Sequence, residues 1–146
     1  MKRAIVTGGA GFIGSHLTER LLREGHQVLV VDNCSTGREG NLAHLFTSDR
    51  LQLVHCDVTN FQALKPLFKG VDWVFHLAAL ADIVPSIQNP DNYHRSNVDG
   101  TVAVLEAARH ARVKRFIYAA SSSCYGIPRQ FPTSETAPIQ PMYPYA

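Results

Sequence analysis

The segment Thr7-Gly8-Gly9-Ala10-Gly11-Phe12-Ile13-Gly14 follows the apolar run Ala4-Ile5-Val6 and precedes an amphipathic stretch, Ser15 to Glu24. This order predicts a strand that passes directly into a helix through a glycine-rich turn. Glycine permits backbone angles that a Cβ forbids, and it lets a pyrophosphate and a neighbouring strand approach closely. The first turn of a helix also offers free N–H groups and the positive end of the helix dipole, so the segment predicts an anion-binding turn.

An acidic residue stands where a dinucleotide-binding turn needs one. Asp32 closes the apolar run Val28-Leu29-Val30-Val31. It follows Gly14 at close to the ~20-residue spacing that places a carboxylate on an adenosine ribose. A glycine pattern alone is weak evidence, but this one lies between a strand and a helix and is followed by the acid. We therefore predict a dinucleotide cofactor rather than a turn without a ligand.

The properties of the whole chain favour one soluble globular domain without a strongly charged partner. Its 146 residues are enough for one core, and 45% hydrophobic residues, 18% charged residues and a net charge of +2 are ordinary values. The basic run from Arg109 to Arg115 has no interleaved aromatic residues and ends a predicted helix, where cations are favoured. We interpret it as a solvated helix end and predict no nucleic-acid binding.

The N-terminus, the apolar runs and the cysteines together predict a cytoplasmic protein. Met1-Lys2-Arg3 leads directly into the first predicted strand, so we expect no signal peptide. The longest apolar run, Trp73 to Ala81, contains His76 and is too short to cross a bilayer, so we expect no membrane partner. Three widely spaced cysteines form no C-x-x-C motif and are expected to be reduced thiols: Cys34, Cys56 and Cys124.

The sequence predicts no metal centre. The seven histidines do not recur at metal-ligand spacing, and the nearest cluster is His55-Cys56-Asp57. Neighbours on a strand point to opposite faces of the sheet and cannot converge on one ion.

Apolar runs typical of buried parallel strands alternate with helical patterns, which predicts an α/β fold with a doubly wound parallel sheet. The expected strands are Lys2–Thr7, Gln27–Asp32, Leu51–Cys56, Val71–Leu77 and Arg115–Ala120. The expected helices are Gly11–Glu24, Asn60–Phe68 and Ser96–Arg112, with a short helical turn near Asn41–Phe46. The last helix is apolar around most of its circumference, so we expect it to be heavily buried. After Ala120 an aperiodic segment with five prolines predicts a long loop, placed where such folds bind substrates.

A set of motifs occurs in a fixed order along the chain: the glycine turn, Asp32-Asn33, Asp57-Val58, His76-Leu77-Ala78-Ala79, Ser121-Ser122-Ser123-Cys124-Tyr125-Gly126 and Pro144-Tyr145-Ala146. In this combination the chain resembles the extended short-chain dehydrogenase/reductase superfamily, in its nucleotide-sugar epimerase/dehydratase branch. The resemblance covers the whole chain. It implies a Rossmann sheet with strand order 3-2-1-4-5, NAD across the strand ends, and a C-terminal lobe beyond Ala146 that holds the nucleotide sugar. Residues 1–146 would then be an incomplete NAD-binding domain.

The resemblance implies a cofactor role for residues in several of these motifs. The expected NAD-binding residues are Gly8, Gly11, Phe12, Ile13 and Gly14 for the pyrophosphate, Asp32 and Asn33 for the adenosine ribose, Asp57 and Val58 for the adenine, and Leu77, Ala78, Ala79 and Asn97 for the remainder. The charge of Asp32 would repel a 2′-phosphate and favour NAD over NADP, although Arg38 could hold such a phosphate instead. Asp57 could also cap a helix before Asn60, and Asn97 could be an ordinary polar residue at a helix start.

The resemblance also implies two catalytic residues, Ser121 and Tyr145. Tyr145 would take the proton from a sugar hydroxyl as the attached carbon gives hydride to the nicotinamide, and Ser121 would hydrogen-bond the reacting oxygen. The lysine that assists the tyrosine in this family would fall four residues after Tyr145, beyond Ala146, so we expect this chain alone to be inactive. Three further residues are expected on the substrate side: Ser123, Tyr125 and Ser86, the last in the loop Ile83-Val84-Pro85-Ser86-Ile87.

The residues after Ser121 favour one reaction within the family. Dehydratases and decarboxylases carry a carboxylate there, whereas this chain has Ser122-Ser123 and a 4-epimerase needs no such acid. The resemblance therefore implies a homodimeric UDP-sugar 4-epimerase that works through a 4-keto intermediate. Ala81 stands where some epimerases have a lysine. A nucleotide-sugar dehydratase, decarboxylase or reductase, and an NAD-binding module without catalysis, remain alternatives.

Overall fold

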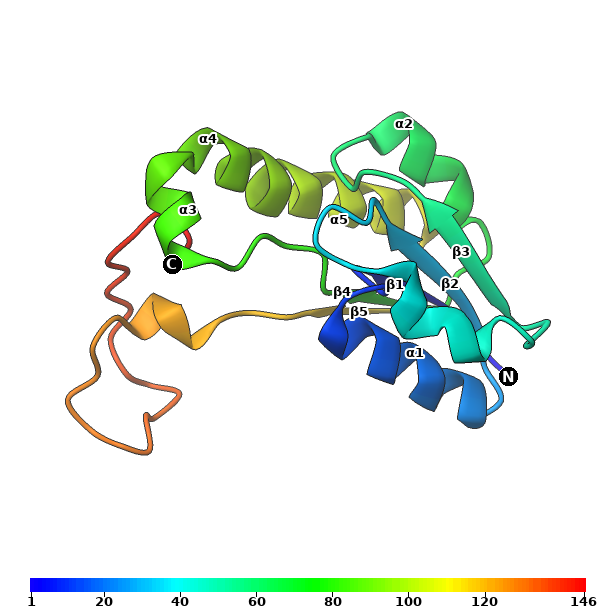
Figure 1. The fold of residues 1–146 in the computed structure, drawn as a ribbon, viewed down its shortest axis with the longest axis horizontal. Helices are drawn as coiled ribbons and strands as arrows, with labels where there is room; N and C mark the ends of the chain where they lie inside the picture. The colour runs from blue at the N-terminus through cyan, green and yellow to red at the C-terminus, as the bar shows by residue number, and fades with distance from the viewer.

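The computed structural model describes residues 1–146 and contains one parallel sheet in the order β3-β2-β1-β4-β5 (Figure 1). The predicted fold class and strand order are confirmed. The strand order reverses between β1 and β4, and such folds bind ligands at the carboxyl ends of the strands beside this reversal. The strands are β1 Arg3–Thr7, β2 Gln27–Asp32, β3 Leu51–His55, β4 Trp73–His76 and β5 Arg115–Tyr118.

Helices cover both faces of the sheet (Figure 1). α1 and the 3₁₀ helix η1 pack on one face, and α2, η2 and α5 pack on the other. None of the helices combines the length and the apolar character needed to cross a membrane. Their bounds are α1 Phe12–Arg23, η1 Glu39–Leu45, α2 Phe61–Leu64, η2 Lys65–Phe68, α3 Ile83–Gln88, α4 Pro90–Tyr93, the π-helical segment η3 His94–Asp99, α5 Gly100–Ala111 and η4 Ser122–Tyr125.

Two apolar cores flank the sheet because successive side chains of a strand point to opposite faces. In β1, Ala4 and Val6 belong to the core beneath α1, whereas Ile5 belongs to the core beneath α2 and α5. The side chains of β2 divide between the two cores in the same way. Strands β1 and β2 are therefore held on both faces, which fixes the positions of their carboxyl ends.

The glycine turn joins β1 to α1 as the sequence predicts, and it leaves no room for a Cβ at Gly8 or Gly14. Gly8 adopts a φ of 68°, and a Cβ on this residue would lie 2.7 Å from the backbone nitrogen of Ala78. A Cβ on Gly14 would collide with the carbonyl oxygen of Gly8 and lie 2.6 Å from the Cα of Gly9. The start of α1 therefore packs directly against the turn residues that follow β1.

The helix predicted over Ser96–Arg112 begins earlier than expected. A continuous helical run starts at Pro90, includes the π-helical segment and ends at Ala111. A π-helical turn shifts the spacing of the apolar positions, so the 3.6-residue pattern does not extend through it. The expectation of heavy burial was also wrong, because three apolar side chains are about half exposed: Val98, Val102 and Leu105.

Two other expectations about local structure need correction. The segment Ile83–Ile87, expected to be a loop, belongs to helix α3. Pro85 falls in the first turn of this helix, where a backbone N–H has no partner within the helix and its loss costs little. Strands β4 and β5 are shorter than predicted and end at His76 and Tyr118. The chain after β5 is largely irregular, as predicted, apart from η4.

We predict that Gly14→Ala destabilises the fold and that Gly40→Ala does not. The added methyl at Gly14 meets backbone atoms that cannot yield, whereas no atom lies within 4 Å of a Cβ built on Gly40 in η1. Overpacking of this kind costs about 1–3 kcal/mol. Urea unfolding of the two variants beside the wild type measures the difference. Equal stability of the two variants would show that the turn can relax around a side chain.

Candidate functional site

Two adjoining pockets lie along the carboxyl ends of the strands. The smaller has a volume of about 320 Å³ and includes the glycine turn, and the larger has a volume of about 590 Å³ and includes the segment after β5. Four residues line both pockets: Leu77, Ala78, Ala79 and Ala119. The pockets therefore form one continuous site over the reversal of strand order, where the fold favours ligand binding.

The first residues of α1 form part of the wall of the smaller pocket. Gly11 occupies the N-cap position of this helix, no side chain caps its first turn, and no acidic residue lies in that turn. Phe12 and Ile13 are exposed beside it. The N–H groups of the first turn have no acceptor four residues earlier within the helix, so they and the helix dipole suit a phosphate group.

Asp32 is fixed at the end of β2 by two backbone hydrogen bonds. The N–H of Ala10 donates to its Oδ2 at 2.9 Å, and the N–H of Cys34 donates to its Oδ1 at 2.8 Å. The residue is buried, yet it lines the smaller pocket together with Asn33. The carboxylate is thus held in one orientation at the pocket wall, with lone pairs left for a ligand hydroxyl.

Asp57 lies across the smaller pocket in the turn after β3. Its Oδ1 accepts hydrogen bonds from the backbone N–H and the hydroxyl of Thr59, each at 2.8 Å. The backbone hydrogen bond from Thr59 is the main cause that lowers the pKa of Asp57, so the group is a carboxylate at neutral pH. The alternative role as a helix cap belongs to Asn60 instead, whose side chain accepts the N–H of Ala63.

Twelve of the thirteen residues predicted to contact a cofactor line the smaller pocket. They are Gly8, Gly11, Phe12, Ile13, Gly14, Asp32, Asn33, Asp57, Val58, Leu77, Ala78 and Ala79. Asn97, the thirteenth, lies in the π-helical segment and lines the larger pocket. Its side chain holds the backbone of Leu80, accepting the N–H at 2.8 Å and donating to the C=O at 2.9 Å. Asn97 therefore positions the segment after β4 that forms the pocket floor.

A hydrogen-bond chain that the sequence analysis did not identify runs from Thr7 to the wall of the larger pocket, which His76 and Thr101 help to line. Thr7 and His76, at the ends of β1 and β4, bond through Oγ1 and Nδ1 at 2.7 Å. The Nε2 of His76 lies 3.0 Å from the Oγ1 of Thr101, and this hydroxyl donates to the C=O of Asn97. Because Thr101 uses its hydrogen for Asn97, Nε2 must carry the imidazole proton and Nδ1 must accept from Thr7.

This proton arrangement keeps His76 neutral. The Oγ1 of Thr7 already accepts the N–H groups of Leu77 and Ala78, at 3.2 and 3.3 Å. A second ring proton would point at this oxygen and displace the hydroxyl hydrogen of Thr7. Burial lowers the pKa of His76 to about 4, in agreement with this geometry. The neutral ring joins β1, β4 and α5 at the wall of the larger pocket, next to the residues that the two pockets share.

The two predicted catalytic residues line the larger pocket together. Ser121 follows β5, and its Oγ accepts the N–H of Ser123 at 3.2 Å, which leaves the hydroxyl hydrogen free to donate. Tyr145 reaches the pocket from the end of the long loop, and its ring meets that of Tyr93 edge-on at 6.5 Å between centroids. Residues more than 20 positions apart in the sequence thus meet at one cavity.

The three residues expected on the substrate side have other contacts. Ser86 is fully buried in α3; its hydroxyl donates to the C=O of Ile83 at 2.6 Å and accepts the backbone N–H of Tyr145 at 3.2 Å. Ser86 lines neither pocket, so the structure gives it the role of holding Tyr145. Ser123 lies in η4, where its backbone bonds Ser121, and Tyr125 lines a separate hollow within the long loop.

The sequence matches the model of one protein family, described as the NAD dependent epimerase/dehydratase family, over residues 4–146. The chain belongs to this family. The parallel sheet in the order β3-β2-β1-β4-β5 is therefore that of a nucleotide-sugar epimerase/dehydratase fold. The resemblance to this branch of the short-chain dehydrogenases is confirmed.

Relatives within the family catalyse different reactions. The chain is 42% identical to a UDP-glucose 4-epimerase of Mycolicibacterium smegmatis, over 99% of this chain and 47% of the relative. It is 41% identical to UDP-glucuronic acid decarboxylase 1 of Arabidopsis thaliana, over 92% of this chain and 29% of the relative. The solved structure of a dTDP-glucose 4,6-dehydratase from Streptomyces venezuelae with NAD bound has a TM-score of 0.93 and 34% identity, over 98% of this chain and 47% of that one. This family member therefore spans less than half the length of these relatives.

We predict that His76 makes the stability of the chain depend on pH. Its pKa is about 4 in the folded state and 6.5 without the fold, so the unfolded chain binds more protons between these values and stability falls as pH falls from 6.5 to 4. The full shift corresponds to roughly 3 kcal/mol. Urea unfolding at a series of pH values should show a shallower dependence for His76→Gln. The exposed control His110→Gln should keep the wild-type dependence, and a wild-type slope in His76→Gln would refute the buried neutral ring.

Proposed function

We propose that the chain is the NAD-binding part of a UDP-hexose 4-epimerase, in which Ser121 and Tyr145 act on the sugar. The observation that carries this proposal is that Ser121 and Tyr145 both line the larger pocket. This pocket adjoins the smaller pocket at the glycine turn and shares its floor. A cofactor in the smaller pocket would extend over Leu77–Ala79 toward these two side chains. The activity, the substrate and a homodimeric assembly are proposed for the whole protein, because the chain spans less than half the length of its relatives.

The smaller pocket has the features that NAD requires. Gly8 and Gly14 leave bare backbone where a Cβ would not fit, and the uncapped start of α1 faces the space where a pyrophosphate would lie. Asp32 is held by Ala10 and Cys34 with its remaining lone pairs free for the ribose hydroxyls. The negative charge of Asp32 disfavours the 2′-phosphate of NADP. When bound, NAD supplies a nicotinamide that accepts hydride from the sugar and returns it.

The residues of the larger pocket supply proton transfer and orientation. Tyr145 takes the proton from the sugar 4-hydroxyl, and Ser121 donates its free hydroxyl hydrogen to the same oxygen as it becomes a carbonyl. Ser86 fixes the backbone of Tyr145 and so sets the distance between tyrosine and sugar. For epimerisation the 4-keto sugar turns over before hydride returns, and Tyr145 gives the proton back.

The side chains beside Ser121 support epimerisation over elimination. Loss of water or of carbon dioxide needs an acid or base besides the tyrosine, whereas the residues that follow Ser121 are Ser122 and Ser123. Asp91 is the one carboxylate among the residues that line the larger pocket, and it comes from α4. The decarboxylase and dehydratase relatives make elimination the competing outcome, which product analysis separates from epimerisation.

We predict that the chain binds NAD more tightly than NADP and that Asp32→Ala reduces this preference. The variant loses the ribose acceptor, which weakens NAD, and it loses the charge that repels the 2′-phosphate. Calorimetric titration of nucleotide-free protein with each cofactor measures both effects. Asp49→Ala removes a carboxylate from the loop before β3, outside the smaller pocket, and serves as the charge control. NADP binding equal to or tighter than NAD binding in the wild type would refute the assignment.

We predict that Tyr145→Phe and Ser121→Ala each lower turnover about a hundredfold in the whole protein while NAD stays bound. Losing one hydrogen bond made in the transition state costs ~3 kcal/mol. An assay of UDP-hexose interconversion, with products identified by NMR, measures the rate and shows whether a 4-epimer or an eliminated sugar forms. Tyr143→Phe provides a neighbouring phenol control and should keep the wild-type rate. The 146-residue chain alone should be inactive in the same assay, and near-normal turnover by Tyr145→Phe would identify a different base.

A further inference from the structure

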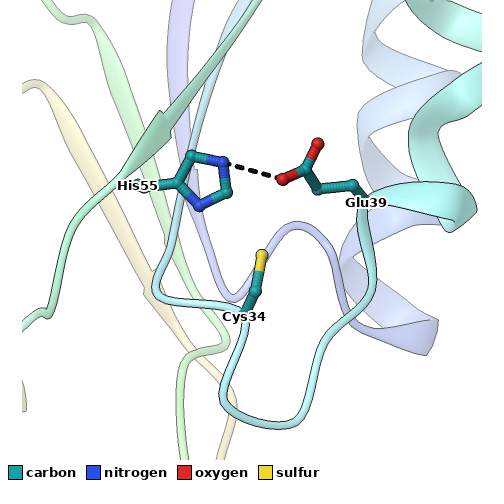
Figure 2. A group of neighbouring side chains, drawn as sticks. All are labelled: Cys34, Glu39 and His55. Atoms are coloured by element: carbon teal, nitrogen blue, oxygen red, sulfur yellow. Dashed lines mark ion pairs between the residues drawn. The ribbon is translucent and has the colours of Figure 1, made fainter.

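The carboxyl ends of β2 and β3 bring together a thiol, a carboxylate and an imidazole (Figure 2). Cys34 lies in the turn after β2, Glu39 is the first residue of η1, and His55 is the last residue of β3. One ligand atom from each side chain lies within 4.8 Å of the other two. The Nε2 of His55 is 2.9 Å from the Oε1 of Glu39. Three chemically different donors therefore face one small volume.

The backbone fixes the positions of two of these three residues, His55 and Cys34. His55 is the register partner of Asp32 in the β2–β3 pair, which places the imidazole at the strand end. Cys34 adopts a φ of 56°, a left-handed conformation, and donates its N–H to Asp32. This conformation is uncommon for residues with a Cβ and persists where the surrounding structure holds it. The turn brings the sulfur toward the two other donors (Figure 2).

We propose that Cys34, Glu39 and His55 form a Zn²⁺-binding site. Thiolate, imidazole and carboxylate are the three kinds of side-chain ligand that Zn²⁺ takes, and three protein ligands leave a fourth tetrahedral position for water or another molecule. Mg²⁺ and Ca²⁺ select oxygen ligands, so the sulfur and nitrogen donors favour zinc over those ions. No step of the proposed sugar chemistry enters this inference.

The distances suit a tetrahedral ion after small side-chain movements. With zinc–ligand bonds of about 2.0–2.3 Å, ligand atoms in a tetrahedral site are roughly 3.5 Å apart. The separations in the cluster run from 2.9 to 4.8 Å at most. The side chains of Glu39 and His55 are 54% and 55% exposed, so they can rotate without disturbing the core. Cys34 is less exposed, so its sulfur would stay in place while the other two side chains move toward the ion.

Cobalt provides a direct test because thiolate–Co²⁺ bonds absorb strongly in the near ultraviolet and tetrahedral Co²⁺ absorbs in the visible. The probe is Co²⁺ alone, titrated into the reduced, untagged chain and then displaced by Zn²⁺. We expect saturable binding of one ion per chain with both absorption bands, and a higher unfolding temperature in the presence of Zn²⁺. Cys34→Ser should remove the thiolate band. Glu39→Gln and His55→Gln should weaken Zn²⁺ binding by at least about tenfold.

Matched controls separate this site from other thiols and imidazoles. Cys56→Ser changes the thiol next to His55 in sequence, and His44→Gln changes an exposed imidazole on η1. Both should bind Zn²⁺ as the wild type does, and circular dichroism without metal establishes that each variant is folded. Three results would overturn the proposal: no saturable binding by the folded wild type, a thiolate band that survives Cys34→Ser, or equal losses in the controls and the ligand variants.

Discussion

The start of α1 packs against the glycine turn with no space for a Cβ at Gly14, and Gly8 packs in the same way against the backbone of Ala78 after β4. The site depends on these two contacts. Because β1 pairs with both β2 and β4, the turn above it is fixed relative to the two strands whose ends carry Asp32 and Leu77. The N–H of Ala10 within the turn holds Asp32 at the end of β2. The close packing therefore positions an uncapped helix start and a buried carboxylate together, although the two are distant in sequence.

A second link connects this turn to the pocket that contains Ser121 and Tyr145. Thr7 directly precedes the glycines, and its hydroxyl bonds the neutral ring of His76, which bonds Thr101 on α5. Thr101 in turn bonds Asn97, whose amide holds Leu80. Buried polar chains of this kind are stable when every donor and acceptor is satisfied, and they then define one geometry. The shared floor at residues 77–79 is therefore held by Thr7 and Asn97, which the uncharged imidazole of His76 connects through Thr101.

Patterns confined to one segment could be predicted from the sequence, and contacts between segments could not. The glycine turn, the five strands and Asp32 depend on local spacing, and the motif order implied the strand order. The π-helical turn that carries Asn97 breaks the helical period, so the apolar pattern did not reveal the earlier helix start at Pro90. The signal that could have revealed it is Asn89 before Pro90, a typical N-cap followed by proline in the first helical position. The buried position of Ser86 under Tyr145 depends on a contact across 59 residues. Likewise, the prediction of no metal site rested on the spacing of the histidines and on the neighbours of His55 along its strand. The two side chains that lie close to His55 come instead from the turn and helix after β2.

Asp32 connects the proposed cofactor site to the proposed zinc site. One oxygen of its carboxylate holds the glycine turn through Ala10, and the other holds the backbone of Cys34. Burial first, and then the charges of Asp32 and Glu39, raise the pKa of the Cys34 thiol. The two carboxylates make the electrostatic field around the sulfur negative. Such a field favours a cation near the thiol for the same reason that it disfavours a 2′-phosphate on the adenosine side. The negative charge of one buried carboxylate can therefore disfavour a negatively charged group, the 2′-phosphate of NADP, and favour a positively charged one, Zn²⁺. The two ligands would approach Asp32 from different sides, one from the glycine turn and one from the turn that carries Cys34.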